Sequence, residues 1–309
     1  MKVFTRLEEA ASFSRPRAVA VGNFDGVHLG HRKILHCLVR YARRHGLSSL
    51  LLTFSPHPEK ILGKGRMLMI QTLAQRLQEV KKSGVEAVLV MPFGLRFSTL
   101  PPHRFLDRVL VQALKARTVL VGENFHFGRK RSGSVTTLKE YSLKTKAFDV
   151  CIIPPVEKAG GPVSSSRIRG LLREGQVGLA GALLGRPYEI AGAIVRGRSI
   201  GRRLGFPTAN LRPQNEILPW GIFISLAGIG RGWYPSLTYI GRRPTFGPGR
   251  LHVETYLLRF QGNLYGRKAT VRLLRRLRPD RKFSSAAALT RQIRLDVRKA
   301  VSYFSHQSS

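Results

Sequence analysis

The sequence predicts an α/β domain with a parallel sheet, followed by a small antiparallel β-barrel domain with a C-terminal helix. Buried strand-like runs alternate with amphipathic helical segments up to about residue 186, and short strands with turn signals come after it. A chain of 309 residues is long enough for two such domains. We therefore expect the first domain at residues 1–185 and the second at residues 186–309.

The first domain is expected to contain five buried strands with helices between them. The strands are predicted at 17–24, 48–54, 86–93, 116–125 and 147–156. Apolar residues at helical spacing mark 29–46 and 71–84 as helices, and the second ends at Gly84. Strands joined through helices form right-handed βαβ units, and such sheets bind ligands beyond the carboxyl ends of their strands. The loops that follow the strands are therefore the expected location of a site.

The second domain follows two short helical segments, which are predicted at 166–176 and 177–185. The barrel strands are predicted at 188–197, 221–230, 233–241, 252–260 and 268–277. The last segment, 284–304, has the apolar spacing of a helix, and Ser284 or Ser285 is its expected N-cap.

Charge and cysteine usage limit the classes of protein that the chain can belong to. Lys and Arg number 53 against 17 acidic residues, so the net charge is +36. A charge of this size suggests nucleic-acid binding, but the basic residues are scattered and no aromatic RNA-binding motif accompanies them. The scattered basic residues favour an enzyme with anionic substrates. The two cysteines form no CxxC pattern, and neither a secretory signal nor a membrane span is evident, so we expect a cytoplasmic protein.

The stretch GNFDGVHLGH, at 22–31, joins a predicted strand to a helix and contains His28 and His31. Three interpretations are open: a metal site that would need a third ligand such as His57, ordinary surface histidines, or a phosphate site. Backbone N–H groups and the helix dipole at a helix N-terminus attract anions. Gly26 and Gly30 would allow close approach of a phosphate. The setting favours the phosphate interpretation.

A second anion-binding element is predicted in VSSSRIRG, at 163–170. It places three hydroxyl groups and two arginines at the start of a helix, and arginine offers a forked donor suited to phosphate. By itself, the pattern describes a serine-capped amphipathic helix equally well.

In the second domain, PTAN places Thr208 and Asn210 on one face of an extended strand. Hydroxyl and amide oxygens are hard ligands that suit Mg²⁺ with a nucleotide phosphate. Glu254 lies within a barrel strand, where a carboxylate could act as a general base in phosphoryl transfer. Taken alone, these residues describe equally well a turn before an edge strand and a salt-bridged glutamate.

The motifs GNFDGVHLGH, TFSPHP, VGENFHFG and VSSSRIR, in that order, resemble the FAD synthetase domain of bacterial bifunctional riboflavin kinase/FMN adenylyltransferases. The resemblance implies a Rossmann-like nucleotidyltransferase fold and adenylyl transfer from ATP to FMN with release of pyrophosphate. By matching position, His28 and His31 would stabilise the ATP phosphates. The nucleotide loop would contain Gly22, Asn23, Asp25, Gly26 and Gly30. The β- and γ-phosphates would be held by Ser164, Ser165, Ser166 and Arg167. The flavin side would be lined by Pro56, His57, Pro58, Asn124, Phe125 and Phe127.

The second half resembles the riboflavin kinase domain of the same family along its whole length. The matching motifs are GRRLGFPTANL, PWGIFI, YIGRRPTFG, VETYLLRFQGNLYGRK and LRPDRKF. The resemblance implies transfer of the ATP γ-phosphate to riboflavin with Mg²⁺. Thr208 and Asn210 would bind the metal and phosphates, and Glu254 would be the base. The loops at 201–206, with Gly201 and Gly205, and at 262–266 would close over the substrates, with Arg278 near the flavin. Arg259 departs from the family, which usually has LDF where this chain has LRF.

We therefore predict a bifunctional enzyme that converts riboflavin to FMN and FMN to FAD. Its partners would be riboflavin, FMN, FAD and ATP, with Mg²⁺ as cofactor and no membrane. Two alternatives are kept. One is another nucleotidyltransferase, such as a cytidylyltransferase or a fragment of an aminoacyl-tRNA synthetase. The other is a basic nucleic-acid-binding protein derived from a lapsed nucleotidyltransferase. The oligomeric state is not predicted.

Overall fold

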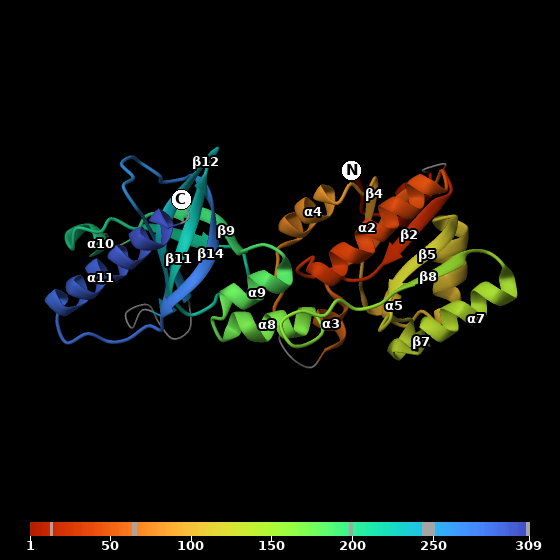
Figure 1. Cartoon of the computed structure of the whole chain (residues 1–309). Coiled ribbons are helices and arrows are strands. Elements are labelled where there is room, and N and C mark those ends of the chain that lie inside the picture. Colours follow the sequence, from red (N-terminus) through yellow and green to blue (C-terminus); the bar gives the residue numbers. More distant parts are fainter. Residues whose placement is uncertain (13–14, 64–66, 198–199, 243–250, 307–309) are drawn as a thin grey trace. The chain divides into compact units, whose positions relative to one another are not determined.

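The computed structural model describes residues 1–309 except 13–14, 64–66, 198–199, 243–250 and 307–309 (Figure 1). Residues 243–247 of the YIGRRPTFG motif therefore lie outside the described residues. The chain forms two compact units, Met1–Ser164 and Ser165–Ser309. The first unit contains the parallel sheet and the second contains the barrel.

The first unit is built on a six-stranded parallel sheet with the order β1-β4-β3-β2-β5-β8. Its strands are β1 (Lys2–Phe4), β2 (Arg17–Val21), β3 (Ser48–Ser55), β4 (Ala87–Pro92), β5 (Ala116–Gly122) and β8 (Asp149–Ile153). The five predicted strands and their parallel arrangement are confirmed. Strand β1 was not predicted; it has three residues and pairs with β4 at the edge of the sheet.

Helical segments and a small hairpin connect these strands. The segments are α1 (Leu7–Ala11), α2 (Leu29–Arg44), α3 (Pro58–Leu62), α4 (Leu73–Lys82), α5 (Leu95–Ser98), α6 (Pro102–Arg104), the π-helix η1 (Phe105–Ala113), the 3-10 helix η2 (Arg129–Arg131) and α7 (Val135–Thr145). The hairpin pairs β6 (His126–Phe127) with β7 (Gly133–Ser134). The predicted α2 and α4 are confirmed, and Thr72 caps α4 by accepting a hydrogen bond from Gln75 N.

The sheet lies between two hydrophobic cores, because successive side chains of a strand point to opposite faces. In β2, Ala18 and Ala20 face the core that contains α2 and α4. Val19 and Val21 face the other core, to which α1, η1 and α7 contribute. The first unit is therefore a three-layer α/β/α arrangement, as predicted for a Rossmann-like domain.

The strand order changes direction between β2 and β5, since β3 and β4 lie on one side of β2 and β8 lies beyond β5. Open parallel sheets bind ligands in the crevice at this point, beyond the carboxyl ends of the two strands. The loop after β2 is GNFDG and the loop after β5 is GENF. The topology thus brings together two loops that lie about a hundred residues apart in the sequence.

The second unit begins with α8 (Ser165–Arg173) and α9 (Val177–Leu184), which were predicted. A closed barrel follows, with the strand order β10-β13-β12-β11-β14-β9. Its strands are β9 (Tyr188–Val195), β10 (Ala209–Pro213), β11 (Gly221–Ile229), β12 (Gly232–Arg242), β13 (Leu251–Leu257) and β14 (Lys268–Arg278). Helix α10 (Ile200–Arg203) lies in the connection between β9 and β10. All barrel pairs are antiparallel, which confirms the predicted class.

The C-terminal helix α11 (Ala286–Ser305) packs on the barrel beside β11 and β12 (Figure 1). Ala300 of the helix is buried against Ile222, Ile224 and Leu237. Of the two predicted N-caps, Ser285 caps the helix by accepting a hydrogen bond from Ala288 N at 3.2 Å. Among the helices that the structure describes, none combines the length and apolar character that crossing a membrane requires.

Candidate active sites

The loop after β2 is held by its own buried side chains. Phe24 and Val27 are buried with α2, and both residues have positive φ angles, 52° and 40°. The buried carboxylate of Asp25 accepts hydrogen bonds from Ile70 N at 3.1 Å and from Gln71 N at 3.4 Å. Asp25 therefore ties its loop to the segment before α4, a contact that the sequence analysis did not anticipate.

The two predicted histidines lie together at the start of α2. His28 is the N-cap, and its Nδ1 accepts a hydrogen bond from His31 N at 3.3 Å. The two imidazole rings stack with their centroids 3.7 Å apart, and the His31 ring also contacts Phe24. Because Nδ1 of His28 uses its lone pair in the cap, the neutral ring carries its proton on Nε2. That N–H group is a donor for an anion at the helix N-terminus.

A metal site at these histidines would need a third ligand. Among the described residues, no three His, Cys, Asp or Glu side chains are grouped closely enough to hold a metal ion. His57, the ligand considered from the sequence, instead caps α3, and its Nδ1 accepts a hydrogen bond from Glu59 N at 3.2 Å. His28 and His31 lie at the N-terminus of α2, a setting that favours an anion.

The segment that precedes the SSSRIR motif runs beside the start of α2. A methyl group built on Gly30 would lie 3.2 Å from the His28 ring and 3.8 Å from Val163 O. Lys33 Nζ, further along α2, donates to Pro154 O at 3.2 Å. Ser164 is thus the next residue after a contact with the histidine loop. Ser165, Ser166 and Arg167 form the first turn of α8, in the second unit.

A pocket of about 380 Å³ opens beside the loop after β2. Six of the predicted site residues line it, namely Gly22, Asn23, Pro58, Asn124, Phe125 and Phe127. Pro56 and His57 are not in its lining. The rings of Phe125 and Phe127 stack with their centroids 5.4 Å apart, which is a suitable surface for a planar heteroaromatic ring.

Four further phenylalanines line the same pocket and were not singled out from the sequence. They are Phe54, Phe93, Phe97 and Phe105, which contact one another in edge-to-face and tilted pairs. Lys130 and Arg131 add two cations to the lining. The pocket therefore combines aromatic walls with positive charge, which suits a flat aromatic ligand that bears a phosphate. Phe54, Phe93 and Phe97 lie in TFSPHP and MPFGLRF, at the ends of predicted strands where a site was expected, whereas Phe105 lies outside these loops.

Arg76, on α4, lies beside the site and is not among the predicted site residues. Its side chain is 3% exposed, and it donates to Asn23 O at 2.7 Å and to Phe54 O at 3.1 Å. Burial lowers the pKa of Arg76, whereas the negative charge of Asp25 acts to raise it. In the sequence, Arg76 is one more basic residue of an amphipathic helix in a basic chain.

The barrel brings Thr208, Asn210 and Glu254 together. Thr208 Oγ1 donates to Glu254 Oε2 at 3.2 Å, and Asn210 lies opposite Glu254 in the pairing of β10 with β13. All three residues are partly exposed. A carboxylate, a hydroxyl and an amide at one place form a set of hard oxygen donors, which fits Mg²⁺.

Two glycines make this cluster possible, because side chains at their positions would collide with Asn210 and with the backbone of Phe206. A methyl group built on Gly197 would lie 2.2 Å from Asn210 Nδ2, and one on Gly201 would lie 2.4 Å from Phe206 O. The Gly201 methyl would also lie 3.1 Å from Thr208 Oγ1. The glycine-rich loop therefore packs directly against the donor set. Gly205, in contrast, has a positive φ of 84° and open space around it.

Arg278 and Arg259 have different surroundings. The Arg278 guanidinium pairs with the buried carboxylate of Asp296 on α11 at 2.8 Å, so it connects the end of β14 to the helix. Arg259 lies in the turn after β13 with a positive φ of 55°. The departure from the family pattern at Arg259 thus falls outside the strand that carries Glu254.

The comparisons with known proteins identify the family of both halves of the chain. The FAD synthetase family model matches residues 10–167 and the riboflavin kinase family model matches residues 184–304. The chain is 37% identical to the bifunctional riboflavin kinase/FMN adenylyltransferase of Pseudomonas fluorescens, over 91% of this chain and 90% of that protein. It is 33% identical to the protein of the same description from Bacillus subtilis, over 93% and 92%. A Streptococcus pneumoniae crystal structure, described as a macrolide-efflux protein, matches with a TM-score of 0.87 and 29% identity over 96% of this chain and 98% of that one.

Proposed function

The chain belongs to the family of bifunctional riboflavin kinases/FMN adenylyltransferases, and we propose that its two reactions use the two sites described above. The enzyme phosphorylates riboflavin to FMN and adenylylates FMN to FAD, with ATP as co-substrate in both steps. The assignment of FAD formation to the first unit rests on one observation: the phenylalanine-lined pocket opens beside the loop that carries the stacked histidines.

In the adenylyl transfer, the isoalloxazine ring of FMN occupies the pocket between the phenylalanines. Lys130 and Arg131 attract its phosphate, and the ATP phosphates bind at the N-terminus of α2. A phosphate oxygen of FMN attacks the α-phosphorus of ATP, and the bond to the leaving pyrophosphate breaks. His28 donates its Nε2–H to oxygens on which charge increases during this step. His31 supports the ring of His28 by stacking and by its backbone N–H. Ser164–Arg167 are proposed to hold the pyrophosphate portion.

In the kinase reaction, Glu254 accepts the proton of the riboflavin 5′-hydroxyl, and that oxygen attacks the γ-phosphorus of ATP. The bond to ADP breaks as the new one forms. The hydrogen bond from Thr208 orients the Glu254 carboxylate. Thr208 and Asn210 are proposed to hold Mg²⁺, which neutralises phosphate charge when it is bound. Arg278 is proposed to border the flavin end while it remains paired with Asp296.

The free thiols of Cys37 and Cys151 are those expected in a reducing compartment, and this supports a cytoplasmic enzyme. The alternative of a lapsed enzyme that binds nucleic acid is motivated by the net charge of +36. Titration of the protein with RNA at several salt concentrations, beside the activity assay, tests it. Tight, salt-dependent binding without turnover would support that alternative.

The proposed division of the two reactions can be tested with one variant in each site. Glu254→Gln should stop FMN formation from riboflavin and leave FAD formation from supplied FMN unchanged. His28→Asn should stop FAD formation from FMN and leave FMN formation from riboflavin unchanged. Glu189→Gln is a matched control, because Glu189 also lies on a barrel strand but pairs with Arg272. Products are separated by chromatography, and loss of both reactions in a folded Glu254→Gln protein would contradict the assignment.

A further inference from the structure

Helix α4 is joined to the loop after β2 by a buried, forked arginine. The Arg76 guanidinium donates to Asn23 O at 2.7 Å and to Phe54 O at 3.1 Å. Asn23 follows β2 and Phe54 lies near the end of β3, and these strands are neighbours in the sheet. One planar side chain thus bridges the carboxyl ends of two adjacent strands. Both bridged residues line the phenylalanine pocket.

The same loop is joined to the beginning of α4 by Asp25. Its carboxylate accepts hydrogen bonds from Ile70 N and Gln71 N, directly before the N-cap residue Thr72. The loop is therefore connected to α4 twice, before the helix starts and within it. Two connections of this kind restrict both the distance and the rotation of the loop relative to the helix.

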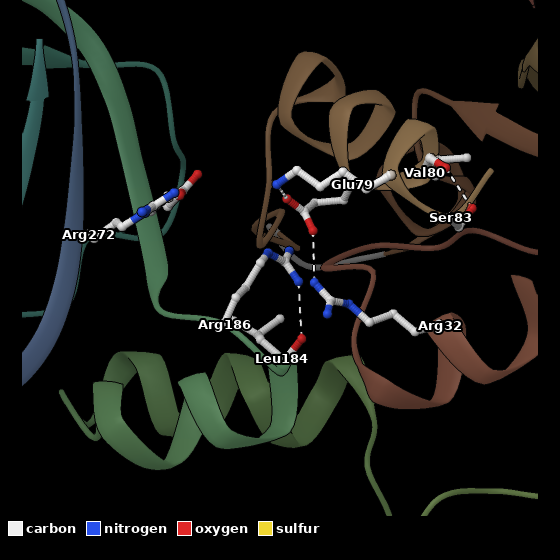
Figure 2. A network of polar contacts seen from close by, with 9 residues as sticks. Arg32, Glu79, Val80, Ser83, Leu184, Arg186 and Arg272 are labelled. Atoms are coloured by element: carbon white, nitrogen blue, oxygen red, sulfur yellow. Dashed lines mark hydrogen bonds and ion pairs between the residues drawn. The ribbon is translucent and has the colours of Figure 1, made fainter. Parts of the chain in front are cut away.

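A third contact connects α4 to the helix that carries the histidines. Glu79, three residues after Arg76, pairs with Arg32 of α2 at 2.9 Å (Figure 2). Arg32 immediately follows His31 in the sequence. Residues of α4 therefore contact the loop at Asn23, the pocket wall at Phe54 and the first turns of α2.

The need to fill space in the core does not by itself explain why an arginine is buried at position 76. Removing a charged group from water is costly unless hydrogen bonds compensate for it, and an apolar side chain could fill a core position without that cost. The two carbonyl groups that Arg76 bonds are both at the edge of the pocket. Thr53 Oγ1 donates to Asn23 O as well, at 3.0 Å, so this carbonyl accepts two hydrogen bonds. The arrangement stabilises one position of the Asn23 backbone.

We propose that Arg76 is a positioning residue for FAD formation, which sets the backbone at Asn23 and Phe54 so that the nucleotide loop and the flavin pocket have the correct spacing. Arg76 does not contact the reacting atoms in this proposal; it acts through the two carbonyl groups. The proposal rests on the assignment of adenylyl transfer to the first unit.

The test compares Arg76→Met and Arg76→Lys with Arg17→Met in the full chain. Arg17 is a matched control because it is also a buried arginine that donates to backbone carbonyls, those of Ala10 and Leu114. It is the first residue of β2, so it lies at the opposite end of that strand from Asn23. The kcat and KM of adenylyl transfer are measured separately for FMN and ATP. Thermal unfolding followed by circular dichroism reports whether the first unit is folded, and riboflavin kinase activity is the internal reference for the second unit.

Arg76→Met should lower kcat/KM for adenylyl transfer by about 100-fold, the usual effect of misplacing reactive groups by about 1 Å. Arg76→Lys should restore part of that loss, because an ammonium group keeps the charge but loses the fork. Kinase activity should stay unchanged in both variants. Arg17→Met should lower the thermal midpoint yet leave both kcat/KM values within about twofold. Folded Arg76→Met protein with unchanged kcat/KM for adenylyl transfer would overturn the proposal.

Two further variants keep the outcome decisive. If Arg76→Met does not fold, Thr53→Val removes the other donor to Asn23 O with little change in size, and it should lower adenylyl-transfer kcat/KM about fivefold. Because Thr53→Val leaves both hydrogen bonds of Arg76 in place, the deciding variant in that case is Arg76→Lys: unchanged adenylyl-transfer kcat/KM in folded Arg76→Lys protein overturns the proposal. His28→Asn separates this inference from its premise. If His28→Asn retains FAD formation, the site assignment fails; if it stops FAD formation and Arg76→Met does not reduce it, only the role of Arg76 fails.

Discussion

Replacing Gly201 by alanine should disable the kinase reaction, because the structure leaves no room for a methyl group there. The added Cβ would lie 2.4 Å from Phe206 O, so that carbonyl must move by about 1 Å to reach the 3.4 Å of an ordinary contact. The carbonyl belongs to the backbone that leads directly to Thr208. Its movement carries the Thr208 hydroxyl away from Glu254, to which it now donates at 3.2 Å.

A displacement of about 1 Å at reacting groups can cost about 100-fold in rate, which corresponds to about 2.7 kcal/mol. We expect a loss of that size in kcat/KM for riboflavin phosphorylation. Overpacking of the loop should also cost about 1–3 kcal/mol of unfolding free energy. Adenylyl transfer from ATP to supplied FMN should be unaffected, since it is proposed to occur in the first unit.

The assay measures initial rates of FMN formation from riboflavin and ATP, with FAD formation from FMN as the internal reference. Gly170→Ala is the control, because a methyl group on Gly170 meets nothing within 4 Å and its helical position favours alanine. Its kinase rate should equal that of the unaltered enzyme. If folded Gly201→Ala protein phosphorylates riboflavin within about threefold of the normal rate, the role of loop packing is refuted.

Three other changes have defined outcomes. Phe125→Ala removes a stacked ring from the pocket, so the KM for FMN in adenylyl transfer should rise about tenfold; an unchanged KM contradicts the pocket assignment. Asp296→Ala leaves the mostly buried Arg278 without its carboxylate and should cost about 3 kcal/mol in urea unfolding, whereas a loss below about 1 kcal/mol contradicts the buried pair. Burial and a hydrogen bond to Asp107 raise the pKa of Tyr141 from 10.0 to about 12, so its stabilisation is complete below pH 10 and is lost as the pH rises toward 12. Tyr141→Phe should therefore reduce the fall in thermal midpoint over that range, and an identical fall would contradict the shift.

The histidine motif illustrates how far a local pattern can be interpreted. The spacing of His28 and His31 predicts that both rings lie on one side of a helix start, and the structure stacks them there. The pattern also predicts the helix that begins after His28. It does not reveal that Asp25 faces inward to backbone N–H groups, because the segment that contains Ile70 is distant in sequence.

The phenylalanine pocket depends more on tertiary packing than the histidine motif does. Phe125 and Phe127 follow a predicted strand, so their place near the end of the sheet could be expected from the sequence. Phe54, Phe93 and Phe97 lie at or just after the ends of two other predicted strands, where the same reasoning applies, but only the packing of those segments shows that these rings line one pocket. In a sequence rich in apolar strands, each of these residues is equally consistent with an ordinary core position.

The sequence by itself determined the class and order of the two folds, because hydrophobic periodicity distinguishes buried strands, amphipathic helices and short barrel strands locally. It also determined where the motif residues lie relative to those elements. Only the tertiary structure decided which side chains meet: Arg76 with two strand ends, Thr208 with Glu254, and Arg278 with Asp296. These contacts join residues separated by 18 to 53 positions in the sequence. They depend on strand order and on packing, and no local sequence pattern specifies either.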